Sequence, residues 1–461
     1  MFPLDMSQIA GAMSAEVAGR GGQGIFRSVC TDSRAVKEGD LFFALRGERF
    51  DGHNFVDKAV SSGARGVVLD RRVEGIPPGT AVFMVKDTLT ALQDLAGYNR
   101  RRSGVPVVGV TGSSGKTSTK DLICSVLSAR FRTLKTEGNL NNEVGLPLTL
   151  LRLDEGAQAA VVEMAMRGAG EIDLLSRIAL PTGAVITNIG EAHFELLGSV
   201  DNIARAKGEI LDHVPPRGFA VLHGESPYIK REALRCRGRV IFYGEDPGLD
   251  VCARNIAPEA GGNRFTAVFG GREAEFFIPL PGRHNVINGL AAIAVGLEMG
   301  LEVEDIRDGL AKAGLSALRL EISELNGVKI INDSYNANPS STRAAIQVLA
   351  EAAGEKSRKI AVLGDMLELG ERSGPGHREV GRAVREAGVD LLVAVGHRAR
   401  YIGLGAREAG LSPGRIQYYE TAREAARELK KTIRPGDVIL IKGSRGMKME
   451  EFVRTLKEDN G

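Results

Sequence analysis

The fold of this chain is decided by the stretch Val107-Val108-Gly109-Val110-Thr111-Gly112-Ser113-Ser114-Gly115-Lys116-Thr117-Ser118-Thr119. An apolar run over residues 105–110 predicts a buried strand, and a loop rich in glycine and serine follows it. Beyond the loop, apolar residues recur at helical spacing between Leu122 and Leu127. Strand, loop and helix start together predict a phosphate-binding loop, because backbone N–H groups converge there and a helix N-terminus is partially positive.

The loop motif predicts how a nucleotide would be held. In this geometry the ammonium of Lys116 reaches the β- and γ-phosphates and the Thr117 hydroxyl holds Mg²⁺. The common eight-residue pattern has a glycine five positions before Gly115, where this chain has Val110, so the motif is the shorter Gly-x-x-Gly-Lys-Thr. The alternative is an ordinary strand-to-helix turn. The residues expected to contact the nucleotide are Gly112, Ser113, Ser114, Gly115, Lys116, Thr117 and Ser118.

Length and composition indicate a globular protein of several domains. The chain has 461 residues, more than one hydrophobic core usually organises, and 43% of them are hydrophobic and 26% charged. A net charge of +2 at pH 7 gives no reason to expect nucleic acid or another polyanion as a partner. The four cysteines are scattered without metal-ligand spacing, which argues against a zinc site or a disulfide framework.

Targeting and membrane patterns are not visible in the sequence. The N-terminus lacks a basic region followed by an apolar core, and no apolar run approaches the length of a membrane span. We therefore expect a cytoplasmic protein without membrane insertion, which acts on small molecules or soluble partners.

Alternation of apolar segments with helical patterns predicts an α/β protein of three domains, over residues 1–104, 105–316 and 317–461. The first is expected to be a small α/β domain, the second a P-loop-type domain on a parallel sheet, and the third a Rossmann-like domain. The strands expected in the first and third domains are 41–45, 66–69, 81–85, 329–331, 359–363, 391–395 and 438–441.

Polar residues follow two further strands of the central domain. The apolar run 159–162 ends in Glu163, and the strand 184–189 leads to His193. An acid at the carboxyl end of a strand beside a phosphate loop is well placed to bind Mg²⁺. The helical segment 203–210 carries Lys207, which composition alone predicts to be a solvated surface lysine.

Three polar segments are each open to two interpretations. The loop over residues 136–147, which contains Asn139, Asn141 and Asn142, either is a turn or presents amides to a polar ligand. Asn285 and Asn288, three apart at a helix start, either cap that helix or face one ligand. The segment Asp32-Ser33-Arg34 either binds a base, sugar or phosphate or forms a turn with a solvated arginine.

Six motifs together resemble the Mur ligases, the ATP-dependent amide-bond-forming enzymes of peptidoglycan precursor synthesis. The resemblance covers essentially the whole chain, including the three-domain layout. The motifs occur in the family's order at residues 111–117, 163, 188–193, 206–209, 282–288 and 332–339.

Three segments discriminate within the family, at residues 139–143, 333–339 and 363–370. They resemble the member that joins D-alanyl-D-alanine (D-Ala-D-Ala) to UDP-N-acetylmuramoyl-tripeptide (UDP-MurNAc-tripeptide). The resemblance implies that ATP phosphorylates the tripeptide carboxylate to an acyl phosphate. The dipeptide amine then attacks, and phosphate leaves through a tetrahedral intermediate, which gives UDP-MurNAc-pentapeptide, ADP and phosphate. It also implies a monomer.

The same resemblance implies roles for the residues around the phosphate loop. Lys116 would bind the γ-phosphate, and Thr117 with Glu163 would hold a first Mg²⁺. His193 would bind a second Mg²⁺ that bridges the γ-phosphate and the substrate carboxylate. Lys207 would be carbamylated by CO₂ beside that second metal. The catalytic set would be Lys116, His193 and Lys207.

The remaining implied contacts belong to adenine, ribose and the two acceptor substrates. Asn285 and Asn288 would contact adenine, while Arg319 and Asp333 would reach the phosphates and ribose. The first domain would bind the UDP moiety, and closure of the third domain would complete the site. The substrate-binding residues would be Asp32, Ser33 and Arg34 for UDP, Asn139, Asn141 and Asn142 for the muramoyl-peptide, and Asn336, Asn338 and 364–369 for the dipeptide.

Each alternative function either predicts a feature that this sequence lacks or leaves a feature of the sequence unexplained. A sibling ligase that adds the third amino acid would carry an Asp-Asn-Pro-Arg-type loop in the third domain. A folylpolyglutamate-type synthetase would lack a domain resembling residues 1–104. A P-loop ATPase or GTPase used as a switch would need a base-reading motif such as Asn-Lys-x-Asp, and it would not explain the third domain.

Overall fold

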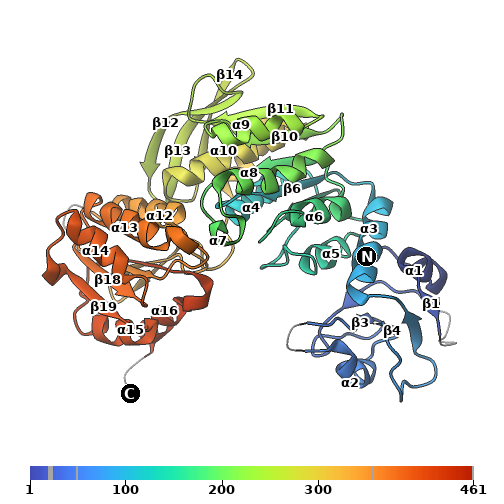
Figure 1. Ribbon diagram of the computed structural model, residues 1–461. Helices are drawn as coiled ribbons and strands as arrows, with labels where there is room; N and C mark the ends of the chain where they lie inside the picture. Colours follow the sequence, from blue (N-terminus) through green and yellow to red (C-terminus); the bar gives the residue numbers. More distant parts are fainter. Residues whose placement is uncertain (19–23, 48–49, 355–356, 459–461) are drawn as a thin grey trace.

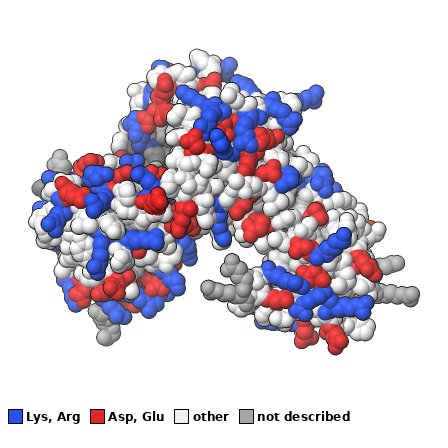
Figure 2. Space-filling view, viewed as in Figure 1, with Lys and Arg blue, Asp and Glu red and all other residues white. Residues whose placement is uncertain are grey.

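The chain folds into three α/β domains, each built on its own sheet, in a computed structural model that describes residues 1–18, 24–47, 50–354 and 357–458. The central domain lies between the other two (Figure 1). Figure 2 shows the N- and C-terminal domains apart from each other, with an open space between them, and positive and negative side chains interspersed over all three domains. No described helix is long and apolar enough to cross a membrane.

The N-terminal domain has a five-stranded sheet in the order β1-β5-β4-β3-β2, parallel except for the antiparallel β1–β5 pair. The three strands predicted here are confirmed as β3, β4 and β5. Asp87 accepts a hydrogen bond from Thr90 N and thereby starts the last helix. The elements are α1 (Met6–Met13), β1 (Glu16–Val17), β2 (Val29–Cys30), β3 (Leu41–Phe43), η1 (Gly52–Phe55), α2 (Val56–Ser61), β4 (Gly66–Leu69), β5 (Ala81–Met84) and α3 (Thr88–Ser103).

Helix α3 joins the N-terminal and central domains through a shared hydrophobic core. It packs against α1 on one side and against two central-domain helices on the other. Leu92 and Leu95 belong to the same buried cluster as Leu150 and Leu175 of the central domain. The guanidinium of Arg100 donates to the carbonyl oxygens at the end of a central-domain helix. The first two domains are therefore packed as one body.

The central domain has a nine-stranded sheet in the order β14-β13-β12-β11-β10-β9-β6-β8-β7. Its elements are β6 (Val107–Thr111), α4 (Lys116–Leu127), β7 (Thr133–Lys135), α5 (Gly145–Leu150), β8 (Ala159–Glu163), α6 (Glu171–Ala179), β9 (Gly183–Ile186), α7 (Phe194–Leu197), α8 (Val200–Gly208), η2 (Glu209–His213), β10 (Phe219–His223), α9 (Pro227–Glu232), η3 (Ala233–Arg235), β11 (Arg239–Gly244), β12 (Val251–Glu259), β13 (Gly262–Phe269), β14 (Arg272–Ile278), α10 (Arg283–Glu298) and α11 (Val303–Ala311).

The central sheet is parallel over most of its strands, as predicted, and carries an antiparallel extension that was not predicted. In the order of the sheet, all strands from β7 through β6 to β12 are parallel. Strands β13 and β14 extend the sheet beyond β12, and each is antiparallel to its neighbour. Gly270 and Gly271 both have positive φ between β13 and β14, which suits a two-residue hairpin turn. The Gly-Gly pair between alternating segments was a hairpin signal that the prediction overlooked.

The C-terminal domain has a six-stranded sheet in the order β15-β16-β20-β17-β18-β19, in which only β15 is antiparallel. The four predicted strands are confirmed as β16, β17, β18 and β20, while the edge strands β15 and β19 were not predicted because they are partly exposed. The elements are β15 (Glu321–Leu325), β16 (Val328–Asn332), α12 (Pro339–Ala352), β17 (Lys359–Gly364), η4 (Gly370–Arg372), α13 (Ser373–Glu386), β18 (Leu391–Val395), α14 (Arg400–Glu408), η5 (Pro413–Arg415), β19 (Ile416–Tyr419), α15 (Ala422–Lys430), β20 (Val438–Lys442), η6 (Arg445–Met447) and α16 (Glu450–Lys457).

Candidate active site

The candidate site lies at the carboxyl ends of β6, β8 and β9. Strand β6 sits between β8 and β9, so the connections that leave these strands run to opposite sides of β6. Such a switch point opens a crevice at the edge of a parallel sheet. The ends of β6 and β8 bring Thr111 and Glu163 to this crevice, and Thr187 follows directly after β9; of these, Glu163 was predicted.

The phosphate loop is held in shape by the segment that follows β9. Ser114 N donates to Asn188 Oδ1 at 2.8 Å, which fixes the loop backbone. Gly112 has φ +150°, and a Cβ there would lie 1.9 Å from Thr187 Oγ1. Gly115 has φ +78°, and a Cβ there would lie 2.9 Å from the side chain of Asn288. Both glycines are therefore required for the loop to pack this tightly.

Lys116, Thr117 and Glu163 meet directly behind this loop. Thr117 Oγ1 donates to Glu163 Oε2 at 2.7 Å, and Asn141 Nδ2 donates to Glu163 Oε1 at 2.8 Å. Lys116 Nζ donates to the carbonyl of Gly112 at 2.8 Å. Burial lowers the pKa of Lys116, although the charge of Glu163 opposes that effect.

These groups fit a magnesium ion next to a phosphate. A buried carboxylate beside a hydroxyl offers the oxygen ligands that Mg²⁺ prefers, and both side chains are nearly inaccessible to solvent. Among the described residues, no group of three or more His, Cys, Asp and Glu side chains gathers closely enough to hold a metal alone. Such an ion would need further oxygens, which ATP phosphates supply.

His193 lies at the mouth of the crevice, at the start of α7. Its φ of +66° is unusual for a residue with a side chain. Its Nδ1 is buried and lies 3.0 Å from Glu368 Oε2 of the C-terminal domain, but it makes no aligned hydrogen bond with a described residue. The contact with His193 lowers the pKa of the Glu368 carboxyl, so this carboxylate occupies the Nδ1 side of the ring in the present domain arrangement.

Lys207 is buried, so the prediction from composition of a solvated lysine is wrong. Its side chain is on the last turn of α8, the residue is 1% exposed, and no hydrogen bond or ion pair reaches its ammonium from the residues that the structure describes. Burial, followed by repulsion from Lys116, lowers the pKa of Lys207 well below its usual value. Composition could not reveal this, because the burial arises from the packing of α8 on the central domain.

A cavity of about 280 Å³ between the central and C-terminal domains brings the predicted nucleotide contacts Asn288, Arg319 and Asp333 together with three predicted residues of the phosphate loop, Ser114, Gly115 and Ser118. Asn285 is fully buried and donates to the Pro281 carbonyl at 2.8 Å, so it supports the cavity wall. Neither asparagine caps α10, which begins after Gly282 without a side-chain cap. The capping interpretation is therefore wrong.

Three residues of this region were not predicted as site residues: His284, Tyr335 and Lys442. His284 and Lys442 line the same cavity, and Lys442 pairs with Asp333. The guanidinium of Arg319 lies 4.2 Å from the ring centre of Tyr335, a cation–π contact that orients it. Lys442 could have been found from the sequence, because it ends an apolar strand as Glu163 does.

A cavity of about 210 Å³ at the phosphate loop also spans both domains. The central domain contributes Lys116, Thr117, Glu163 and His193, and the C-terminal domain contributes Arg319 among others. Asn336 and Asn338 line this cavity as well, but each side-chain oxygen accepts a local backbone N–H, from Ala337 and Ser341 respectively.

A neighbouring cavity of about 440 Å³ is lined by His193, Glu368 and the predicted acceptor residues Asn139, Asn141 and Asn142. Asn142 Oδ1 accepts from Gly145 N at 2.9 Å, at the start of α5. The loop therefore combines both interpretations: it is a turn that starts a helix, and it faces a cavity beside the phosphate loop.

The segment Asp32-Ser33-Arg34 is not brought to these cavities. Arg34 Nε and Nη2 donate to Asp32 at 2.9 and 2.7 Å in an exposed turn of the N-terminal domain, and the residue Ser33 is buried. The two arginine contacts hold the pKa of Asp32 at about 2.

Polar contacts bridge the central and C-terminal domains beside His193. Arg372 Nε donates to Glu191 Oε1 at 2.9 Å, and Arg372 also pairs with Glu379 on its own domain. The site is thus divided between two domains whose contact includes an ion pair.

Comparison with known proteins gives matches over all three domains. Family models match residues 26–100 (Mur ligase family, catalytic domain), 110–296 (Mur ligase middle domain) and 318–445 (Mur ligase, glutamate ligase domain). The UDP-N-acetylmuramoyl-tripeptide–D-alanyl-D-alanine ligase of Bacillus subtilis is 43% identical over 437 residues, which cover 95% of this chain and 94% of the relative.

Solved structures agree with this result. A crystal structure of MurF from Acinetobacter baumannii superposes with a TM-score of 0.90 at 36% identity and covers 99% of both chains. MurF ligase from Thermotoga maritima in complex with ADP gives a TM-score of 0.82 at 30% identity, with 93% of this chain and 97% of that chain covered.

Proposed function

The chain belongs to the Mur ligase family, and we propose that it ligates D-Ala-D-Ala to UDP-MurNAc-tripeptide at the expense of ATP. The observation that carries this function is the match of all three domains, nearly end to end, to ligases of this one specificity. The reaction is an ATP-dependent amide-bond formation of peptidoglycan synthesis. The alternative functions named above, the sibling ligase among them, are not favoured by any observation of the site.

The phosphate loop and its neighbours account for the handling of ATP. A carboxylate is a poor electrophile, so it must first be converted to an acyl phosphate. Lys116 would bind the γ-phosphate, and Arg319 lies across the same cavity to balance further phosphate charge. Thr117 and Glu163 would hold one Mg²⁺, and His193 would hold another. These ions would neutralise the negative charge of the phosphate groups.

The division of the site between two domains supports a closing motion. ATP and the precursor would bind first, and the C-terminal domain would then bring the dipeptide and exclude water. Water exclusion matters because an acyl phosphate hydrolyses readily if solvent reaches it. The dipeptide amine attacks the acyl carbon, and phosphate leaves from the tetrahedral intermediate.

The buried amine of Lys207 supports carbamylation by CO₂. Carbamylation requires the neutral amine, and the lowered pKa of Lys207 favours that form. The amine nitrogen bonds to the carbon of CO₂ and releases a proton, which leaves an anionic carbamate. The resulting anion would attract Lys116, where a lysine ammonium would be repelled by it, and would offer oxygens to the second metal.

The contacts of the acceptor substrates are proposed from the cavities and, for the UDP moiety, from the family resemblance of the N-terminal domain. Asn139, Asn141 and Asn142 would hold the muramoyl-peptide, because their cavity adjoins the phosphate loop. Asp32, Ser33 and Arg34 would bind the UDP moiety, with Arg34 turning from Asp32 to the diphosphate. Asn336, Asn338 and the segment 364–369 would shape the dipeptide pocket. We place the domain boundaries at 104/105 and 316/317 and expect a monomer.

The reaction can be tested by phosphate release from ATP and Mg²⁺. Release that requires both UDP-MurNAc-tripeptide and D-Ala-D-Ala, with UDP-MurNAc-pentapeptide as product, is expected. Release with a single amino acid in place of the dipeptide would indicate a sibling ligase. Release without either acceptor substrate would indicate a plain ATPase.

A further inference from the structure

Lys207 depends on the surrounding protein for its position, because its own side chain has no described polar partner. It lies on the last α-helical turn of α8, and the chain continues into η2 immediately afterwards. A buried group without partners is held only by its backbone and by packing. Whatever fixes the last turn of α8 therefore fixes the reactive nitrogen of Lys207.

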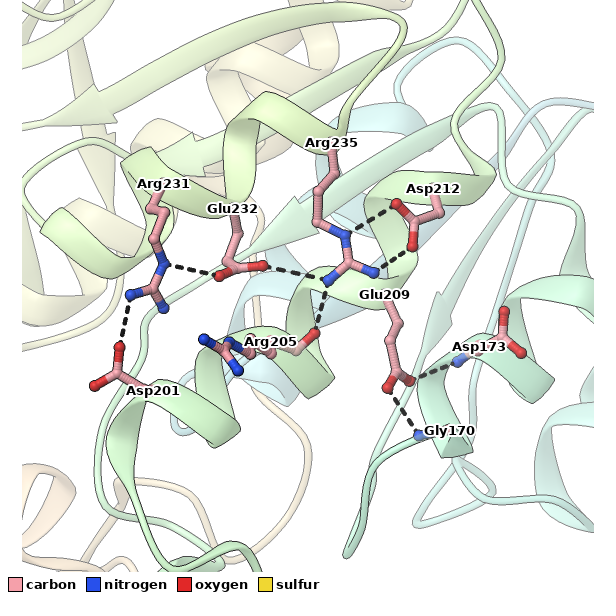
Figure 3. A network of polar contacts seen from close by, with 9 residues as sticks. All are labelled: Gly170, Asp173, Asp201, Arg205, Glu209, Asp212, Arg231, Glu232 and Arg235. Carbon is pink, nitrogen blue, oxygen red and sulfur yellow. Dashed lines mark hydrogen bonds and ion pairs between the residues drawn. The ribbon is translucent and has the colours of Figure 1, made fainter.

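Glu209 ties this turn to α6. Its carboxylate accepts hydrogen bonds from Gly170 N at 2.8 Å and Asp173 N at 3.0 Å, which are free donors at the first turn of α6 (Figure 3). Gly170, the N-cap residue of α6, provides no side-chain cap of its own. Glu209 therefore caps α6 from another element, and its negative charge suits the helix N-terminus.

Arg235 ties the same turn to η2 and η3. Its Nη1 donates to the carbonyl oxygen of Arg205, in the last turn of α8, at 3.0 Å, and its Nε donates to Asp212 at 2.9 Å (Figure 3). Nη1 also contacts Glu232 at 3.3 Å. A planar guanidinium can make these bonds together because its N–H groups point in fixed directions.

Glu232 closes the network against the backbone beside Lys207. It is 6% exposed, and a Cβ added at Gly208 would lie 2.8 Å from its Oε2. The carboxylate thus passes directly over the residue that follows Lys207. Its other oxygen accepts from Arg231 Nε at 3.1 Å.

We propose that Arg235 and Glu209 are positioning residues for Lys207, which hold the last turn of α8 from two sides and thereby keep the buried lysine amine in its place. This inference rests on the proposed function, in which Lys207 acts at that site. Neither residue touches substrate. Displacement of a reacting group by about 1 Å can lower a rate about 10²-fold, so a loosened turn would be visible in catalysis.

Arg231 is a matched control within the same network. It also pairs with Glu232, but its other partner is Asp201, in the first turn of α8, at 2.6 Å. Removal of Arg231 would disturb the start of α8 and leave the contacts of its last turn in place. Arg231→Met and Arg235→Met therefore remove the same kind of side chain. Arg231 contacts the start of α8, and Arg235 contacts its last turn.

The test uses the full chain grown with lysine labelled with ¹³C at Cε, and the Lys207 resonance is identified by its loss in Lys207→Arg. We expect this resonance to move or split in Arg235→Met and Glu209→Gln and to stay unchanged in Arg231→Met. We also expect kcat to fall about tenfold or more in the first two variants, with a smaller change in the KM for ATP. Arg235→Lys should restore part of both losses, since its ammonium keeps the positive charge and can still donate to one of these acceptors.

A Lys207 resonance and a kcat that are unchanged in Arg235→Met would overturn the proposal. Equal changes in Arg231→Met and Arg235→Met would also overturn it, because they would indicate a general loss of structure. If Arg235→Met does not fold, the nearly isosteric Glu209→Gln decides the question. If the wild-type chain releases no phosphate, the proposed function fails, while the resonance still tests the positioning of Lys207.

Discussion

Thr117 Oγ1 and Glu163 Oε2 lie 2.7 Å apart, so the residue after the phosphate-loop lysine is bonded to the last residue of the neighbouring strand. Forty-six positions separate the two residues in sequence. The pair places a hydroxyl and a carboxylate on one side of the phosphate loop, where Mg²⁺ bound to ATP would lie.

Glu163→Gln should abolish most activity, because an amide cannot replace a carboxylate in neutralising Mg²⁺. We expect kcat to fall by about 10²-fold or more, the range seen when charge stabilisation of a transition state is removed. The measurement is phosphate release over a titration of Mg²⁺. Glu155→Gln, at an exposed loop position, is the control. A normal Mg²⁺ dependence in Glu163→Gln would contradict the assignment.

Lys207→Ala should lose activity by about 10²-fold or more and regain part of it when a short-chain carboxylate such as acetate is added. The truncation leaves space in a buried site, and the carboxylate can occupy the place of the carbamate. Lys120→Ala is a suitable control, since Lys120 is also fully buried but donates to the Thr136 carbonyl at 2.9 Å. Absence of rescue in Lys207→Ala would argue against the carbamate.

His284 should make the protein sensitive to acid. Burial lowers the pKa of His284 from 6.5 to about 4, so between these pH values the unfolded chain binds a proton that the folded chain does not. Stability contributed by neutral His284 is thus lost as the pH falls from 6.5 to 4. We expect the free energy of unfolding to decrease by about 2 to 3 kcal/mol less in His284→Gln than in the wild type between pH 6.5 and pH 4. Urea unfolding at several pH values provides the measurement. An unchanged pH dependence in His284→Gln would show that the pKa of His284 does not differ between the folded and the unfolded chain.

Arg34→Ala should raise the KM for UDP-MurNAc-tripeptide about tenfold or more and leave the KM for ATP unchanged, because a charged hydrogen bond to the diphosphate is lost. Steady-state kinetics with each substrate varied in turn provides the measurement. Arg71→Ala is the control variant, because Arg71 forms a similar ion pair in the same domain, with Asp51 at 2.9 Å. Equal effects of the two variants would remove the UDP assignment from Arg34.

Binding of an ATP analogue together with UDP-MurNAc-tripeptide should reduce the radius of gyration in small-angle X-ray scattering, because the C-terminal domain closes. Arg372→Ala should alter the ligand-free profile, since Arg372 pairs across the domain interface with Glu191. Arg378→Ala should not, because Arg378 pairs with Glu408 inside the C-terminal domain at 3.0 Å. A profile that ligands leave unchanged would count against closure.

Local features of the site could be predicted from the sequence, and features that depend on long-range packing could not. Gly112, Thr117, Glu163 and His193 follow from strand ends, because parallel strands bring their carboxyl ends to one edge. The burial of Lys207 could not be derived in this way, nor could the contact between Arg372 and Glu191, which are 181 positions apart. Such contacts depend on how α8 and the domains pack.

The shared core of the first two domains has a consequence for how the protein unfolds. Helix α3 buries its apolar face in both domains, whereas the two main clusters of the C-terminal domain contain only residues from Leu320 onward. Residues 1–316 should therefore melt as one cooperative unit and the C-terminal domain as a second, which gives two calorimetric transitions. Homologous chains should then exchange their C-terminal domains more readily than their N-terminal ones.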